Sequence, residues 1–321
     1  MYDCNITIVD AEGGNALKTY EDGSSAYLYN LYIYAESEFA HGIYTAGGYI
    51  YASDLNVTTY GTSSSAIATD TGGGIIEVYD STANTYGLKS ALLYSTGNIT
   101  ASNLQGTSNR SPACVIDGSN NWTLSNSAVS ASPEEHGVFQ TMSTVSSNDT
   151  STEALAWVIG GSVAESGGTY GLIFASNIIF NIYLDDVDIS ISSGILANSS
   201  ADDWGTSGSN GGTLNVHLTD IDVTGDVYVD SISAVSITLE SSTWSGAINS
   251  NDTDGDAGVI LDSDSTWTVT GDSYLTILVD GDDTLSNIES DRYTVYYESS
   301  SNSWLDNSTY SLSGGGSLIP S

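Results

Sequence analysis

The sequence has almost no positive charge. Of its 321 residues, four are lysine or arginine and 40 are aspartate or glutamate, which gives a formal net charge of -36. Nucleic-acid binding needs basic clusters that displace phosphate counterions, and the chain has none. A protein this acidic also repels anionic membranes and polyanionic substrates. The composition therefore excludes nucleic-acid and membrane partners, and it indicates a surface suited to solubility or to cation binding.

Cysteine, proline and strong helix formers are scarce as well. Two cysteines cannot form a disulfide framework, and three prolines leave the polar turns to glycine, serine, asparagine and aspartate. Tyrosine outnumbers phenylalanine by 21 to 4, which favours short strands over helices. No apolar run reaches membrane-spanning length and no secretory signal is visible. We expect an extracellular protein, either in a mature or trimmed form with a larger parent or with an added Met1.

Short motifs recur at intervals of about 23 to 25 residues, which is the signature of a repeat architecture. One column consists of Asp or Asn residues, some of which are the middle residues of the motifs SDL, SNL and SNS. Its members are Asn30, Asp54, Asp80, Asn103, Asn126 and Asn177. In a second column, each residue is the first of a short apolar pair. Its members are Ile43, Ile67, Leu92, Val115 and Val138. Further on, a Ser-Thr-Trp motif recurs at Trp244 and Trp267, and leucines keep a similar spacing at Leu218, Leu239 and Leu261.

Each repeat contains two or three short segments with alternating apolar residues, which is typical of strands with one buried face. We predict one all-β domain over residues 1–321, a parallel β-helix with about 23 to 25 residues per coil. The repeat is looser near 143–153 and 198–213, where polar loops are inserted. A β-propeller is the main alternative, but it needs units of about 40 to 50 residues. Recurrence in single steps of 23 favours the β-helix.

The predicted stacking has consequences for individual residues. Ile99 and Leu104 should face the core, and Asn103 should occupy a corner because asparagine tolerates left-handed backbone angles. Cys4 and Cys114 lie about five coils apart, or roughly 24 Å along the rod. A disulfide needs Cα atoms within about 7 Å, so we predict that the two thiols are not bonded to each other.

Several coils begin with a residue followed by glycine and an apolar residue, namely His41-Gly42-Ile43, Tyr86-Gly87-Leu88, His136-Gly137-Val138 and Tyr170-Gly171-Leu172. With these coil starts, the SDL, SNL and SNS corners and the STW coils, most of the chain resembles the right-handed parallel β-helix families. These include pectate-lyase-like proteins and the non-catalytic repeats of microbial surface adhesins. The resemblance implies a right-handed coil and does not specify one function.

The sequence offers no clear catalytic constellation. Lyases of this fold use an Arg or Lys base beside calcium-binding carboxylates, whereas Lys18, Lys89, Arg110 and Arg292 are scattered and isolated from acidic ladders. Glycoside hydrolysis needs two carboxylates that flank the bond. The best carboxylate cluster is on an outer face, at Asp186, Asp188, Asp220 and Asp222. Related polygalacturonases add a Gly-His-Gly and an Arg-x-Lys element, and the chain has neither.

Two acidic turns are candidates for a Ca²⁺ site, because Ca²⁺ prefers several oxygen ligands. The densest contains Asp252, Asp254 and Asp256, and a second spans residues 280–283. The first lacks the downstream glutamate of an EF-hand. The alternative for each turn is a solvated polar turn without a bound ion. No other cofactor is expected.

Two further surface features are a concentration of tyrosines and a set of glycosylation sequons. Tyrosines are concentrated before residue 100 and could form an outward strip that stacks on sugar rings or on another protein. Sequons for glycosylation occur only slightly more often than chance allows, at Asn5, Asn56, Asn98, Asn109, Asn121, Asn148, Asn198, Asn251 and Asn307.

We therefore expect an extracellular or cell-surface structural protein, such as a stalk, fibre subunit or adhesin module, without catalysis. Its expected partners are a glycan or surface protein, together with further copies joined end to end through exposed strand edges. The alternative is a carbohydrate-binding protein or an enzyme, a glycoside hydrolase or polysaccharide lyase, that uses the Asp186 and Asp220 face.

Overall fold

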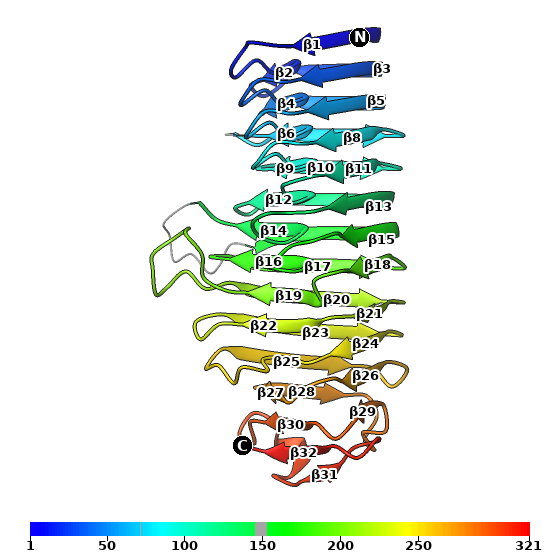
Figure 1. The fold of residues 1–321 in the computed structure, drawn as a ribbon, viewed down its shortest axis with the longest axis vertical. Coiled ribbons are helices and arrows are strands. Elements are labelled where there is room, and N and C mark those ends of the chain that lie inside the picture. The colour runs from blue at the N-terminus through cyan, green and yellow to red at the C-terminus, as the bar shows by residue number, and fades with distance from the viewer. Residues whose placement is uncertain (71, 145–152) are drawn as a thin grey trace.

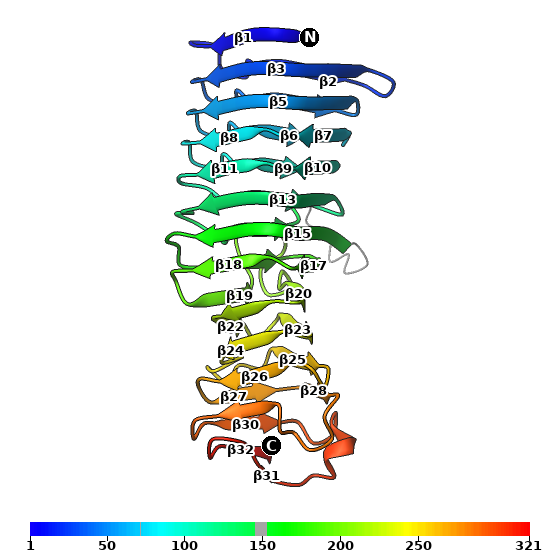
Figure 2. The same ribbon diagram turned by 90° about the vertical axis from the view of Figure 1, so that its right-hand side faces the viewer.

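The computed structural model describes residues 1–70, 72–144 and 153–321 and is a parallel β-solenoid of about 13 turns. The strands follow one another along a rod, with the N-terminus at one end and the C-terminus near the other (Figure 1 and Figure 2). This architecture confirms the predicted fold class and excludes the propeller. In the described part of the chain the helical structure is one short turn, η1 (Ser303–Leu305), and no helix could cross a membrane.

Two long parallel sheets run along the rod. The larger contains β1 (Tyr2–Ile8), β3 (Ser25–Ala35), β5 (Tyr49–Thr59), β7 (Ile75–Tyr79), β8 (Thr82–Thr85), β10 (Asn98–Ser102), β11 (Gln105–Ser108), β13 (Asn121–Ala131), β15 (Glu153–Glu165), β17 (Ile179–Asp185), β18 (Asp188–Ile191), β20 (Thr213–Thr219), β23 (Ala234–Glu240), β25 (Asp256–Leu261) and β28 (Ile277–Asp280). The second, which we call the groove sheet, contains β2 (Leu17–Tyr20), β4 (Ile43–Ala46), β6 (Ile67–Thr69), β9 (Leu93–Ser95), β12 (Cys114–Asp117), β14 (Phe139–Met142), β16 (Ile173–Ser176), β19 (Ile195–Ser199) and β22 (Asp226–Val229).

Two smaller sheets complete the C-terminal coils. One contains β21 (Asp222–Thr224), β24 (Thr243–Gly246), β26 (Thr266–Val269) and β29 (Ile288–Ser290). The other contains β27 (Ser273–Leu275), β30 (Thr294–Tyr297), β31 (Tyr310–Ser311) and β32 (Ser317–Pro320). Only the β31–β32 pair is antiparallel among the strand pairs of the described residues.

The predicted column of Asp and Asn residues lies at one corner of successive coils, but Asn177 does not belong to it. Asn103 lies next to Asp80 on the following coil, and its Nδ2 donates a hydrogen bond of 2.7 Å to Asp80 Oδ1. The left-handed backbone angles expected of this corner occur at Asp3, Asn30, Asp54, Asp80, Asn103, Asn126, Gly160, Asp186 and Asp220. Asn177 also has a positive φ, but it follows β16 at a different corner. The 51-residue step between Asn126 and Asn177 is therefore not a doubled period of this column.

Alternate side chains of the strands point into the core, and equivalent ones on successive coils form rows. Ile99 and Leu104 are fully buried, as predicted. In the groove sheet the inward row is Ile43, Ile67, Leu93, Cys114 and Phe139. Leu92 and Val138 precede this row by one residue and Val115 follows it by one, so the second predicted column mixes neighbouring positions. Trp244 and Trp267 stack at 5.2 Å inside the C-terminal coils, and Cys4 and Cys114 are free thiols, as predicted.

Coil length varies more than the sequence repeat indicated. Asn98 and Asn121 are register partners 23 residues apart, whereas Asn181 and Asn215 are partners 34 residues apart. The added length lies in corner loops, one of which, 200–212, joins β19 to β20. The other predicted insertion, near 143–153, falls mostly outside the described residues. β20, which follows the loop, pairs with β17 and β23 in continuous register, whereas the pairing of β19 with β22 has a register shift between Ile195 and Ala197. The insertion therefore leaves the stack of coils intact.

Serine hydroxyls supply hydrogen bonds at the corners between coils. Ser127 Oγ accepts the backbone N–H of Leu104 at 3.0 Å, and Ser81 Oγ accepts that of Leu55 at 3.0 Å. Another corner has the same arrangement, in which Ser90 Oγ accepts the N–H of Ser64 and Ser111 Oγ accepts that of Ser90. Buried backbone donors at a sharp corner need such partners. This need explains part of the serine content.

Candidate functional site

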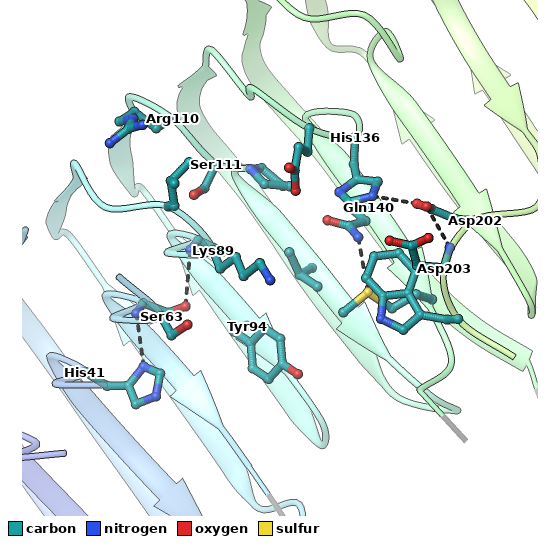
Figure 3. A pocket seen from close by; sticks show the side chains of 18 of the residues that line it. His41, Ser63, Lys89, Tyr94, Arg110, Ser111, His136, Gln140, Asp202 and Asp203 are labelled. Carbon is teal, nitrogen blue, oxygen red and sulfur yellow. Dashed lines mark hydrogen bonds and ion pairs between the residues drawn. The ribbon is translucent and has the colours of Figure 1, made fainter. Parts of the chain in front are cut away.

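A groove of about 630 Å³ lies on the outer face of the groove sheet. Its floor is apolar, because Ala91, Val115 and Met142 pack together there with Tyr94 and Trp204. Figure 3 shows the polar side chains that surround this floor, which come from several successive coils. A concave apolar surface with a few convergent polar groups is the usual form of a ligand site.

His41 forms one end of the groove. Its Nδ1 accepts the backbone N–H of Ser65 at 3.0 Å, and its ring stacks on Tyr44, whose hydroxyl donates to Asp70 Oδ2 at 2.7 Å. Burial lowers the pKa of His41 to about 4, although Asp70 and the bond from Ser65 act in the opposite direction. The ring is therefore neutral at neutral pH, with its proton on Nε2 as a hydrogen-bond donor.

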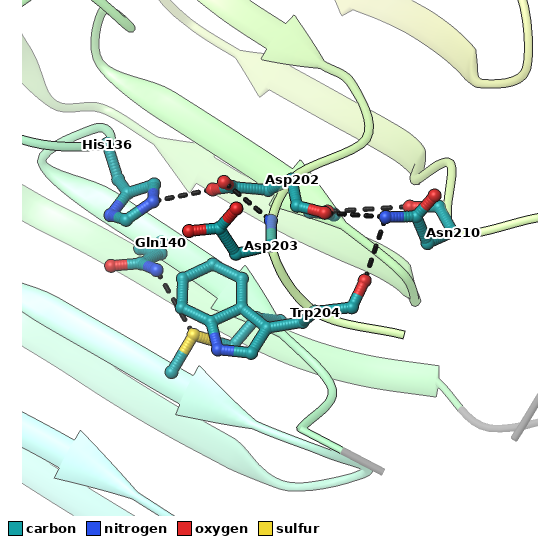
Figure 4. A network of polar contacts seen from close by, with 8 residues as sticks. His136, Gln140, Asp202, Asp203, Trp204 and Asn210 are labelled. Atoms are coloured by element: carbon teal, nitrogen blue, oxygen red, sulfur yellow. Dashed lines mark hydrogen bonds and ion pairs between the residues drawn. The ribbon is translucent and has the colours of Figure 1, made fainter. Parts of the chain in front are cut away.

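His136 forms the other end of the groove, together with the 200–212 loop (Figure 4). His136 Nε2 lies 2.6 Å from Asp202 Oδ2, and its ring packs against Trp204 at 5.0 Å. Asn210 fixes the loop, because its Nδ2 donates to the carbonyl oxygens of Asp202 and Trp204 at 2.6 and 2.8 Å. The loop thus holds an indole ring at the wall of the groove.

The groove also gathers an unusual share of the chain's charged groups. Lys89 and Arg110 line it, although the whole sequence has only four such cations. Arg110 pairs with one exposed carboxylate, that of Glu134, at 2.6 Å. Glu135 and Asp203 also line the groove, are exposed, and form no hydrogen bond or ion pair through their carboxylates with other described residues.

This set of groups suits a carbohydrate. Trp204, Tyr94 and Tyr170 offer ring faces or edges for the apolar side of a sugar. Gln140, Asp203 and the neutral ring of His41 offer donors and acceptors for hydroxyl groups. The groove is lined by residues of successive coils.

The structure brings the predicted aspartates together as a solvated surface. Asp186 and Asp220 occupy the same corner on neighbouring coils, where the Asp186 N–H donates to Thr219 O at 3.1 Å. Asp188 begins β18 and Asp222 begins β21, and these strands are in contact. All four side chains are exposed. The predicted adjacency is thus observed, whereas carbohydrate binding at this face stays a prediction.

The acidic turns are organised by their own hydrogen bonds. Asn249 holds the turn that contains Asp252 and Asp254, since its side chain bonds to Thr253 N, Oγ1 and O at 2.9–3.1 Å. Hydrogen bonds from Ser286 and Thr284 lower the pKa of Asp282 well below its usual range. The described residues contain no group of three or more His, Cys, Asp or Glu side chains arranged to hold a metal. Ca²⁺ binding at Asp252, Asp254 and Asp256 stays a prediction.

The remaining predicted surface residues are distributed along the rod. Tyr2, Tyr29, Tyr51 and Tyr79 form a continuous outward strip, with ring centroids 4.8 to 5.7 Å apart between neighbours. Exposed sequon asparagines are Asn5, Asn56, Asn98, Asn109, Asn251 and Asn307, and half-buried ones are Asn121 and Asn198. Asn148 lies outside the described residues. Glycosylation at these sites stays a prediction.

Sequence analysis did not identify the groove. His41 and His136 were recognised only as coil starts, and Lys89 and Arg110 only as scattered cations. The available signal was that two of the three histidines and two of the four cations fall within residues 41–136, where the repeat is most regular. Stacking these coils brings the four residues to one face.

Comparisons with known proteins identify no relative. No protein-family model matches the chain, and neither the curated proteins nor the solved structures contain a match. The resemblance to β-helix families is therefore one of architecture and repeat pattern.

Proposed function

We propose that this protein is an extracellular or cell-surface β-solenoid that binds a glycan in the groove between His41 and His136, without catalysis. The observation that carries the proposal is the apolar floor bordered by Trp204, Tyr94 and Tyr170, with hydrogen-bonding groups at both ends. Aromatic rings beside polar groups are the chemistry that holds sugars in water.

A glycan array followed by titration calorimetry tests the proposal. We expect Trp204→Ala to weaken binding of the selected glycan by roughly tenfold or more, because an aromatic contact of about 1 kcal/mol is lost together with the area it buries. Asp186→Ala is the matched control, because Asp186 lies on the other candidate face and its loss should leave affinity unchanged. Loss of binding in Asp186→Ala alone would move the site to the acidic face.

Glycoside hydrolysis is the second candidate, favoured by the two unpaired carboxylates Glu135 and Asp203 in the groove. Hydrolysis needs an acid and a base or nucleophile on either side of the bond. Reducing-end release from the glycan selected on the array would support this candidate. Its abolition by Glu135→Gln or Asp203→Asn, with affinity retained, would assign the activity to the groove, whereas an unchanged glycan supports binding alone.

A further inference from the structure

Lys89 differs from the other cations of the chain. Lys18 lies over the rings of Tyr20 and Tyr44, with Nζ 5.2 and 4.8 Å from their centroids. Arg110 pairs with Glu134, and Arg292 lies 4.0 Å from Asp291. Within the described residues, the ammonium of Lys89 has neither a carboxylate within 4.0 Å nor an aromatic ring beneath it. In a protein of net charge -36, an ammonium without such a partner is unexpected.

The turn that carries Lys89 directs it into the groove. Its φ of 54° lies in the left-handed region, which a long side chain such as lysine seldom adopts. Figure 3 shows the side chain extending from this turn into the groove. Phe39 and Ser63 occupy the same corner on the two preceding coils and have the same left-handed angle, so this conformation belongs to the corner. What sets Lys89 apart is an unpaired cation beside the groove, and this observation points to a charge supplied by the ligand.

Resting on the proposed function, we propose that the ligand is a glycan that is neutral except for one anionic group, a carboxylate or a sulfate, which pairs with Lys89. The restriction to one group follows from the rest of the groove. Glu135, Asp203 and the Asp202 partner of His136 line the same groove, and a second anion near them would be repelled. The total charge of -36 also disfavours polyanions such as oligouronates.

The test compares matched ligands. Using the backbone identified on the array, four probes are titrated: the neutral oligosaccharide, the same chain with one carboxylate, the same chain with one sulfate, and an oligouronate of equal length. We expect one or both singly charged probes to bind roughly five- to tenfold more tightly than the neutral one, the size of a charge-assisted hydrogen bond in a partly open site. The preference should shrink as salt is raised from low to high concentration.

Two variants assign the preference. Lys89→Asn removes the charge and keeps a residue that tolerates a positive φ, so the turn is retained. It should reduce the affinity for the charged probe to that for the neutral probe. Lys18→Asn makes the same charge change outside the groove and should keep the preference. Thermal unfolding of both variants checks that the rod is intact.

The outcomes separate the two proposals. Equal binding of neutral and charged probes, or a preference that survives Lys89→Asn, refutes the role of Lys89 and leaves glycan binding in place. Tighter binding of the oligouronate refutes the restriction to one charge. Failure of every glycan to bind the wild-type chain refutes both proposals together.

Discussion

The carboxylate of Glu165 is a buried anchor at the end of β15, and its replacement should destabilise the coil there. The side chain is 2% exposed. Its Oε1 accepts the N–H of Gly167 at 2.7 Å, and its Oε2 accepts the N–H groups of Ser192 and Ser193 at 2.9 and 2.7 Å. One charged group therefore fastens the turn after β15 to the turn after β18.

The magnitude follows from the donors left without a partner. In Glu165→Gln one oxygen becomes an NH₂ group that faces a backbone donor, so we expect a loss of about 2 kcal/mol in the free energy of unfolding. Glu165→Ala leaves the donors of Gly167 and Ser193 without a carboxylate and should lose about 4 kcal/mol. Glu134→Gln, on an exposed surface pair, is the control and should change stability by less than about 1 kcal/mol.

The pH dependence provides an independent signature. Burial raises the pKa of Glu165, but the hydrogen bonds from Ser193, Gly167 and Ser192 outweigh it and hold the pKa below the unfolded value of 4.5. A lowered pKa means that the stabilisation is fully present above pH 4.5 and is lost as the pH falls through the folded pKa. The stability gap between wild type and Glu165→Gln should therefore be widest at neutral pH and narrow in acid.

Urea unfolding at neutral and acidic pH measures the gap, and amide hydrogen exchange at Gly167 and Ser193 shows whether the loss is local. The reasoning is refuted if Glu165→Gln is as stable as Glu134→Gln at neutral pH. It is equally refuted if the gap widens on acidification.

Three further predictions concern the core, a corner and the groove. Trp244→Ala should lower the free energy of unfolding by about 3 to 5 kcal/mol in denaturant titrations, because it removes the stack on Trp267 and the hydrogen bond to Gly225 O; a loss below 1 kcal/mol would contradict this packing. Ser127→Ala should lose about 1 to 3 kcal/mol, since the buried N–H of Leu104 loses its acceptor, and faster exchange of that amide would locate the effect. The ring of His41 should titrate in NMR near pH 4, and a midpoint near its ordinary 6.5 would show that the ring is not buried as described.

The parts of the fold that depend on short-range repetition could be predicted from the sequence. Asn103 and Asp80 occupy equivalent corners because each needs a left-handed backbone, a local demand that residue type reveals. Trp244 and Trp267 could be paired because their coils have nearly equal length. The alternation of apolar residues fixed which side of each strand is buried.

The groove could not be predicted in the same way. His136 meets Asp202, 66 residues later, only because the 200–212 loop folds back along the rod. Irregular loops obey no period, so the sequence does not show which coil they reach. The position of Asn177 was misjudged for a related reason, since the coil that leads from β14 to β16 is 34 rather than 23 residues long. Outward residues such as Lys89 carry no hydrophobic signal that would reveal their neighbours.

The 200–212 loop joins β19 to β20, which keeps a continuous register with the coils on both sides, and the same loop supplies Trp204 to the groove. The register of the strands and the indole at the groove are thus determined by different stretches of the chain. Exchanging the loop would therefore replace the side chains at this end of the groove while β20 keeps its pairing with β17 and β23.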